Sequence, residues 1–155
     1  MICADAEGFA AALPRTGGLV GLDLGTRTIG LAVSDGLRQI ASPLMTLKRV
    51  KFSQDAAAIL ALVAERELVG IVLGLPLNMD GSEGPRAQST RAFARNLERL
   101  TPLPIGFWDE RLTTVAAERA MLEADLSRAR RAASIDAVAA GLILQGMLDR
   151  LRHLG

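Results

Sequence analysis

The sequence is poor in aromatic residues, in lysine and in cysteine, and each shortage narrows what the protein can be. Aromatic side chains make up 3% of the 155 residues, so the core must consist of aliphatic side chains. The single cysteine, Cys3, excludes an internal disulfide and a cysteine-rich zinc site. Lys48 and Lys51 are the only lysines among 18 basic residues. Contacts to phosphate would therefore fall mainly to arginine, whose planar guanidinium can bind phosphate through two hydrogen bonds.

The sequence also lacks a strong net charge and a membrane-length apolar run. The formal net charge of +1 gives no overall attraction to nucleic acid, but it leaves room for a local basic face. The most apolar stretch, residues 133–151, contains Asp136, Gln145 and Asp149. Residues 1–17 carry Asp5 and no basic start of the kind that export signals have. We therefore expect a cytoplasmic protein with no membrane segment.

The distribution of small residues predicts a short leader and one domain. Residues 1–17 are small and mixed and end in Pro14 and two glycines, which favours a flexible leader. The remaining length, residues 18–155, is typical of a single domain.

Strands and helices are expected to alternate along this domain. Residues 19–24 and 29–34 predict two strands joined by a tight turn, and a third strand follows at 40–47, where Pro43 indicates an edge or a bulge. The apolar run 68–76 is typical of a strand buried on both faces, and a fifth strand ends at Asp109 and Glu110. Helices are predicted at 54–66 (capped by Ser53), 85–100, from Thr113 or Thr114 to about Glu123, and from Ser134 to about Arg152, with a mobile loop at 124–132. This order predicts an α/β domain with helices on both faces of a five-stranded mixed sheet.

Acidic residues are expected at one edge of this sheet. Asp23 closes the first strand, Asp109 and Glu110 close the fifth, and Asp136 is expected in the first turn of the last helix. Several carboxylates in one cleft repel one another unless a cation lies between them. Oxygen ligands without histidine or cysteine suit Mg²⁺ or Mn²⁺, and two such ions can promote the cleavage of a phosphodiester bond.

Two of these acidic residues also have a simpler interpretation. Asp136 would interact with the dipole at the start of its helix, and Asp109 would form a surface ion pair with Arg111. The polar loop at 74–84 either hydrogen-bonds to itself or lies where a substrate strand passes. Arginines at 128, 130 and 131 would form a phosphate clamp if a metal site lay beside them.

Four stretches together resemble the YqgF family, also called RuvX: "GLDLGTRTIGLAVSD", "IVLGLPLNMDGSEGPRA", "WDERLTT" and "IDAVAAGLILQ". They occur in the family's order and span residues 19–147. "GLPLNMDG" and "DERLTT" are highly specific as a pair. The resemblance implies an RNase H-like fold and a metal-dependent nuclease whose ligands are Asp23, Glu110 and Asp136, holding Mg²⁺ or Mn²⁺, with two ions expected. The nucleic-acid contacts expected with it are Thr26, Arg27, Asn78, Arg111, Arg130 and Arg131.

The chain is also similar to the Holliday junction resolvase RuvC in its expected fold and in its first and last carboxylates. It departs from RuvC-like enzymes where the strand at 68–76 ends in "LGLP" without an acid, so that Glu110 would have to replace that ligand. Ser134 stands where family members often carry lysine.

The family resemblance implies a nuclease that processes the 5′ end of pre-16S rRNA in ribosome biogenesis. One alternative is a Holliday junction resolvase, which would act as a symmetric dimer; no segment is typical of a dimer helix, so this function ranks second. A further alternative is a non-catalytic nucleic-acid-binding module. The expected partner is structured RNA, or else branched DNA, and the expected state is a monomer or homodimer.

Overall fold

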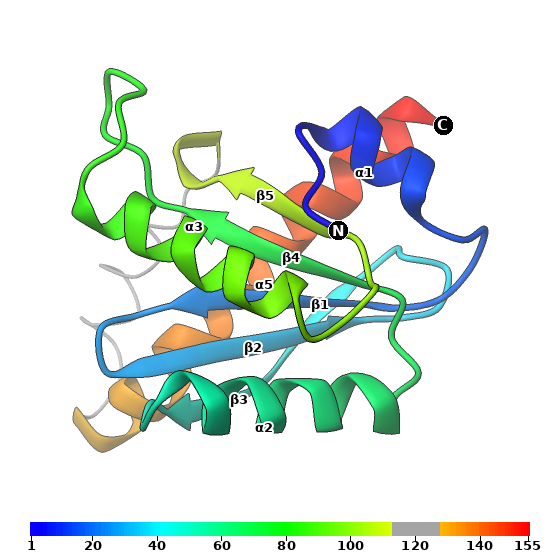
Figure 1. Cartoon of the computed structure of the whole chain (residues 1–155). Coiled ribbons are helices and arrows are strands. Elements are labelled where there is room, and N and C mark those ends of the chain that lie inside the picture. Colours follow the sequence, from blue (N-terminus) through cyan, green and yellow to red (C-terminus); the bar gives the residue numbers. More distant parts are fainter. Residues whose placement is uncertain (113–127) are drawn as a thin grey trace.

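The structure is a computed structural model that describes the backbone of residues 1–112 and 128–155 and the side chains outside 113–134. Its centre is a five-stranded sheet with the strand order β3-β2-β1-β4-β5 (Figure 1). Strands β1, β4 and β5 are parallel, whereas β2 is antiparallel to both of its neighbours. The predicted five-stranded mixed sheet is confirmed. The strands are β1 (Leu19–Leu24), β2 (Thr28–Ser34), β3 (Ala41–Lys48), β4 (Gly70–Leu75) and β5 (Ile105–Asp109).

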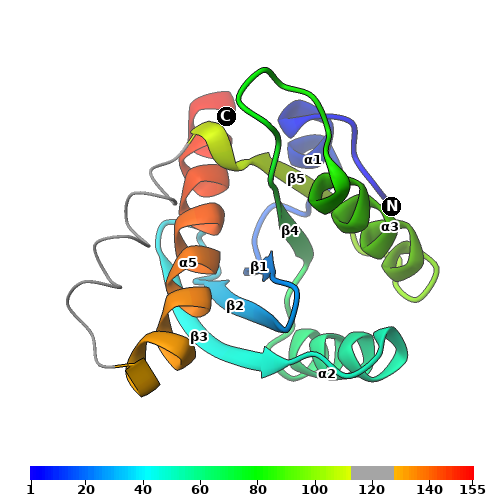
Figure 2. The same ribbon diagram turned by 90° about the vertical axis from the view of Figure 1, so that its left-hand side faces the viewer.

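Helices cover both faces of the sheet, as predicted. Helices α2 (Phe52–Glu65) and α3 (Pro85–Glu98) lie on one face, and α1 (Ala6–Ala12) and α5 (Arg128–Leu154) lie on the other (Figures 1 and 2). Because side chains alternate along a strand, each strand contributes to two apolar layers. On β1, Val20 and Leu22 pack toward α2 and α3, whereas Leu19 packs toward α5.

The opening hairpin and the edge strand follow local sequence signals. In the β1–β2 hairpin Asp23 pairs with Gly30. Strand β3 is at the edge of the sheet, and its register with β2 shifts where Pro43 pairs with Ala32. Proline has no amide hydrogen to donate, so it is tolerated at such a bulge. The expected N-cap of α2 is wrong by two positions, because Lys51 precedes the helix and caps it without a side-chain hydrogen bond.

Residues 1–17 are folded onto the domain, where the sequence favoured a flexible leader. The Asp5 carboxylate accepts a 2.8 Å hydrogen bond from the amide of Gly8 and so caps α1. Phe9 is fully buried. Its ring packs directly on the backbone of Gly106, where a Cβ would lie only 2.9 Å from the ring. The amide of Cys3 donates to the carbonyl of Ile105, which fixes the segment to β5. The packing of one aromatic side chain therefore orders a segment of otherwise small residues.

The last helix begins earlier than the sequence indicated. Helix α5 runs from Arg128, so the predicted loop at 124–132 is wrong for residues 128–132, and Ser134 lies inside the helix. Alanine and arginine are strong helix formers, and no glycine or proline interrupts them there. Asp136 is consequently about two turns from the start of α5. The expectation that it lies in the first helical turn is wrong, and the helix-dipole interpretation that depended on this position is lost with it. The helix expected between Thr113 or Thr114 and Glu123 lies outside the described residues.

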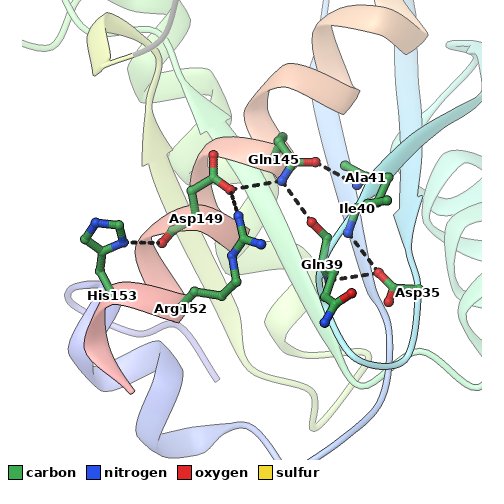
Figure 3. Close-up of polar contacts among 8 residues, drawn as sticks. All are labelled: Asp35, Gln39, Ile40, Ala41, Gln145, Asp149, Arg152 and His153. Atoms are coloured by element: carbon green, nitrogen blue, oxygen red, sulfur yellow. Dashed lines mark hydrogen bonds and ion pairs between the residues drawn. The ribbon is translucent and has the colours of Figure 1, made fainter.

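Polar contacts hold α5 against the turn between β2 and β3 (Figure 3). The Gln145 side chain accepts a 2.9 Å hydrogen bond from the amide of Ala41 and donates one of 3.1 Å to the carbonyl of Gln39. Asp35 accepts hydrogen bonds from the amides of Gln39 and Ile40 and so closes the turn. These contacts fix the rotation of α5 over the sheet. None of the described helices is both long and apolar enough to span a bilayer.

Candidate active site at the carboxyl edge of the sheet

Asp23 is a buried carboxylate at the end of the central strand. Its side chain is 3% exposed, and the alternation along β1 directs it to the face that α5 covers. A buried charge is costly unless another group compensates it. The position is also where ligands bind in open α/β sheets, because it lies beyond the carboxyl ends of parallel strands.

Glycines flank Asp23 on both neighbouring strands and leave room above the sheet. Gly30 on β2 pairs with Asp23, and a Cβ there would lie 2.9 Å from the nitrogen of Ala137 and closer still to the carbonyl of Asp136. On β4, Gly74 follows the residue that pairs with Leu22. A Cβ at Gly74 would lie 3.3 Å from the carboxyl carbon of Glu110. Asp136 therefore lies on one side of Asp23, and Glu110 lies on the other.

The adjacent acids Asp109 and Glu110 lie on different sides of the sheet. The carboxyl group of Glu110 lies over Gly74, on the same face as Asp23, at the start of a short 3₁₀ turn formed by Glu110–Leu112. Asp109 points the other way and forms an ion pair with Arg111, with Nη2 and Oδ2 2.7 Å apart. Hydrogen bonds from the Arg111 side chain hold the pKa of Asp109 below its usual value. Only Glu110 of the two is placed to share a ligand with Asp23.

Asp136 is held by a side chain of the opening hairpin. The hydroxyl of Thr28, the first residue of β2, donates a hydrogen bond to Oδ2 of Asp136. This contact joins residues that are 108 positions apart in the chain. Its effect is to orient the Asp136 carboxylate at the edge where Asp23 lies.

The three carboxylates suit a hard divalent cation in their chemistry, because all their donor atoms are oxygens. Their present spacing is looser than a closed metal site. Within the part of the chain that the structure describes, no three acidic, histidine or cysteine side chains gather closely enough to hold a metal ion.

The loop between β4 and α3 is hydrogen-bonded to itself. The Asn78 amide group donates to the hydroxyl of Ser82, and Asp80 accepts from both the amide and the hydroxyl of Ser82. Gly81 has a φ of +88°, a conformation that favours glycine. Arg111 donates to the carbonyl of Met79, 3.2 Å away, and so ties this loop to the end of β5. The structure therefore contains the contacts of the simpler interpretations: the loop hydrogen-bonds to itself, and Asp109 forms an ion pair with Arg111.

The other expected nucleic-acid contacts differ in position. Thr26 and Arg27 are exposed at the tip of the β1–β2 turn. Arg130 and Arg131 lie in the first turns of α5, and their side chains lie outside the described part of the structure. Both pairs remain predictions.

Two arginines outside the expected nucleic-acid contacts hold the turn after Asp23. Arg49 donates a 2.6 Å hydrogen bond to the carbonyl of Gly25, and Arg86 donates one of 3.2 Å to the carbonyl of Leu24. Their partners are main-chain atoms that the sheet brings near. Arg86 lies in the quoted family stretch that ends in "GPRA", whereas no motif marks Arg49. Arg49 directly follows β3, and this position after a strand is the one feature of the sequence that could have indicated its contact with the turn.

Comparison with known proteins identifies the family. The sequence profile of RuvX, described as Holliday junction resolvase, matches residues 17–150. This chain belongs to the RuvX family. The expected family resemblance is thereby confirmed, and with it the assignment of the protein to a family of nucleases.

Sequence relatives extend over the whole chain of this RuvX-family protein. A protein of Paracoccus denitrificans is 74% identical over 155 residues, which is 100% of this chain and 98% of the relative. One from Rhodobacter capsulatus is 74% identical over the same shares. One from Ruegeria pomeroyi is 67% identical over 99% of this chain and 100% of the relative. Each is described as "Putative pre-16S rRNA nuclease".

Solved structures confirm the fold. RuvC of Thermus thermophilus in complex with a Holliday junction substrate matches with a TM-score of 0.56 and 15% identity, over 86% of this chain and 95% of that chain. RuvC of the same organism matches in a second structure with a TM-score of 0.53 and 14% identity, over 87% and 96%. The RuvX-family chain thus has the RNase H-like fold that the resemblance implied.

Proposed function

We propose that this protein is a metal-dependent nuclease that hydrolyses phosphodiester bonds and processes the 5′ end of the 16S rRNA precursor in the cytoplasm. The observation that carries the proposal is buried Asp23, flanked by Glu110 and Asp136 at the carboxyl edge of the sheet. Relatives at 67–74% identity, described as nucleases of this RNA, support the choice of substrate.

The three carboxylates would divide the binding of Mg²⁺ or Mn²⁺ between them. Asp23 at the end of β1 and Glu110 just after β5 lie on the same face of the sheet, with Gly74 of β4 between them, and Thr28 orients Asp136 through Oδ2. When bound, divalent cations lower the pKa of a water molecule and neutralise charge on the phosphate. The burial of Asp23 excludes bulk water from its carboxylate and keeps it in one position.

In the proposed reaction the oxygen of water forms a bond to phosphorus while the bond from phosphorus to a sugar oxygen breaks. The departing oxygen takes up a proton, so the products are one phosphate end and one hydroxyl end. We expect structured RNA to be the substrate and the protein to act as a monomer or a homodimer.

The test offers two substrates to the same protein with Mg²⁺ or Mn²⁺. One is an RNA fragment that spans the 5′ boundary of 16S rRNA, and the other is a mobile four-way DNA junction. The matched variant is Asp23→Asn, which keeps the shape of the side chain and removes its charge. We expect cleavage of the RNA by the native protein and none by the variant.

A second candidate function is Holliday junction resolution, which the description of the family profile and the RuvC-like fold both favour. Paired, symmetric cuts in the junction without cleavage of the RNA would establish it instead. If the protein bound both substrates and cut neither, it would be a non-catalytic binding module, and the proposal would fail.

A further inference from the structure

A basic cavity opens on the face of the sheet opposite to α5. It has a volume of about 470 Å³ and lies between the end of β1, the segment after β3, and the first turns of α2 and α3. It is separate from the carboxylate site, which lies on the α5 face. Its polar lining residues include Thr26, Arg49, Lys51, Arg86, Ser89 and Thr90.

Positive charge predominates in this cavity. Three cationic side chains, Arg49, Lys51 and Arg86, line it together with one acid, Asp55. Asp55 is 5% exposed, accepts a 3.1 Å hydrogen bond from the amide of Val50, and has Oδ2 4.0 Å from Nε of Arg49. The acid is therefore already engaged, and Lys51 and Arg86 are exposed. In a chain with a net charge of +1, this is a marked local concentration of positive charge.

The helices beside the cavity add to its attraction for an anion. Helices α2 and α3 both begin at its wall, and neither has a side-chain hydrogen bond at its N-cap, which is Lys51 in α2 and Gly84 in α3. The first turn of a helix carries partial positive charge and amide hydrogens without helical partners. The two helix ends and the three cations therefore act in the same direction.

The cavity is connected to the proposed active site through the main chain. Arg49 and Arg86 donate hydrogen bonds to the carbonyls of Gly25 and Leu24, the two residues that directly follow Asp23. The guanidinium of Arg49 also lies 5.8 Å from the centre of the Phe93 ring, which limits its movement. An anion bound by these arginines would contact the same groups that hold the Asp23 turn.

We propose that this cavity binds a backbone phosphate of the nucleic-acid strand at a position away from the bond that is cut. The inference rests on the proposed function in taking nucleic acid as the substrate, and it adds a second anchoring point on the other face of the sheet. Lys51 and Arg86 contact the phosphate by charge, and the hydroxyls of Thr26 and Ser89 supply neutral donors beside them. RNA and DNA share this phosphate, so both are included in the test.

The first experiment measures binding without cleavage. Affinities for a fluorescent single-stranded RNA and for the DNA of the same sequence are measured in EDTA over a range of salt concentrations. We expect Lys51→Gln with Arg86→Gln to weaken binding about tenfold and to lower the slope of log affinity against log salt by about 0.7 for each lost contact. The matched control, Arg95→Gln with Arg99→Gln, removes two positive charges from exposed positions at the C-terminal end of α3 and should change the affinity less than about twofold.

The second experiment identifies which phosphate of the strand binds in the cavity. One phosphate at a time in the strand is replaced by a neutral methylphosphonate. The native protein should lose affinity most at one position outside the cut bond, and the Lys51→Gln, Arg86→Gln variant should show no further loss there. Equal losses in the native protein and the variant at every position would overturn the inference.

The outcomes also separate this inference from the proposed function. Cleavage of RNA by the native protein, together with unchanged binding in the cavity variant, would leave the nuclease proposal standing and refute the cavity site. Failure of the native protein to bind either single strand would refute the cavity site, and the cleavage test with Mg²⁺ or Mn²⁺ would still decide the nuclease proposal. A loss of affinity for DNA alone would assign the phosphate to a DNA strand.

Discussion

Replacement of Gly30 by alanine should displace α5 from the sheet and separate the candidate ligands. The added Cβ would lie 2.9 Å from the nitrogen of Ala137 and closer to the carbonyl of Asp136, whereas real Cβ atoms keep at least 3.0 Å from such atoms. Both obstructing groups are backbone and cannot rotate away. The helix must therefore move outward at this point, by an amount that we take as about 1 Å, a displacement that can cost roughly a hundredfold in rate when it affects a reacting group.

The same substitution should lower stability. Overpacking of a well-filled core costs about 1–3 kcal/mol, and a strand position gains back part of this because alanine loses less backbone entropy than glycine, by about 0.5–1 kcal/mol. We expect Gly30→Ala to lower the free energy of unfolding by about 1–2 kcal/mol in urea titrations, and to lower cleavage about a hundredfold under conditions where the variant is folded.

Two matched glycines make this test decisive. A Cβ at Gly36 meets nothing within 4 Å, so Gly36→Ala should be within about 0.5 kcal/mol of the native protein and fully active. A Cβ at Gly21 would lie 2.7 Å from Cβ of Leu144, further along α5, so Gly21→Ala should lower stability with a smaller effect on cleavage. If Gly30→Ala behaved like Gly36→Ala in both assays, the close approach of α5 to the hairpin would be refuted.

Three further predictions concern single side chains. Glu110→Gln should lower metal-dependent cleavage at least about a hundredfold, whereas Asp109→Asn should stay within about fivefold, because only Glu110 lies on the Asp23 face; equal losses would contradict this. Thr28→Val should raise the Mn²⁺ concentration needed for half-maximal activity severalfold, because valine cannot donate to Asp136. Thr28→Ser keeps the hydroxyl and should leave that concentration close to the native value. Amide hydrogen bonds, chiefly from the residue at position 40, lower the pKa of Asp35 in the folded protein. Its stabilising effect should therefore be complete above about pH 4 and disappear as the pH falls through the folded-state pKa, which urea titrations of Asp35→Ala against the native protein would show as curves that converge at low pH.

Much of the fold follows from local patterns. The hairpin, the bulge at Pro43 and the buried strand at 68–76 each depend on a few neighbouring residues, and the structure contains all three. The N-terminal segment was mispredicted because its order comes from a distant contact, the burial of Phe9 against β4 and β5. The start of α5 was mispredicted because a serine that would make a good N-cap lies within a sequence of strong helix formers.

The candidate site was less accessible to sequence reasoning. Counting alternation from Trp108, which packs against α5 at Gly146, places Glu110 on the α5 face and Asp109 on the other, as in the structure. The choice of Glu110 as the ligand stays a prediction. No such count could find Arg49 and Arg86. They are 37 positions apart and meet the Asp23 turn only because the sheet brings the end of β3 and the start of α3 to the same edge.

The position of Asp23 depends on both faces of the sheet. On the α5 face, missing side chains at Gly30 and Gly74 let the backbone of α5 and the carboxyl group of Glu110 approach the strands. On the opposite face, two arginines hold the carbonyls of the turn that follows Asp23. Both faces contact the same turn, so the proposed phosphate in the cavity and the proposed cation at the carboxylates should affect each other's binding through Leu24 and Gly25. Linkage of this kind is reciprocal for binding free energies, so an occupied cavity should change cation binding at Asp23 by the same factor by which the cation changes phosphate binding.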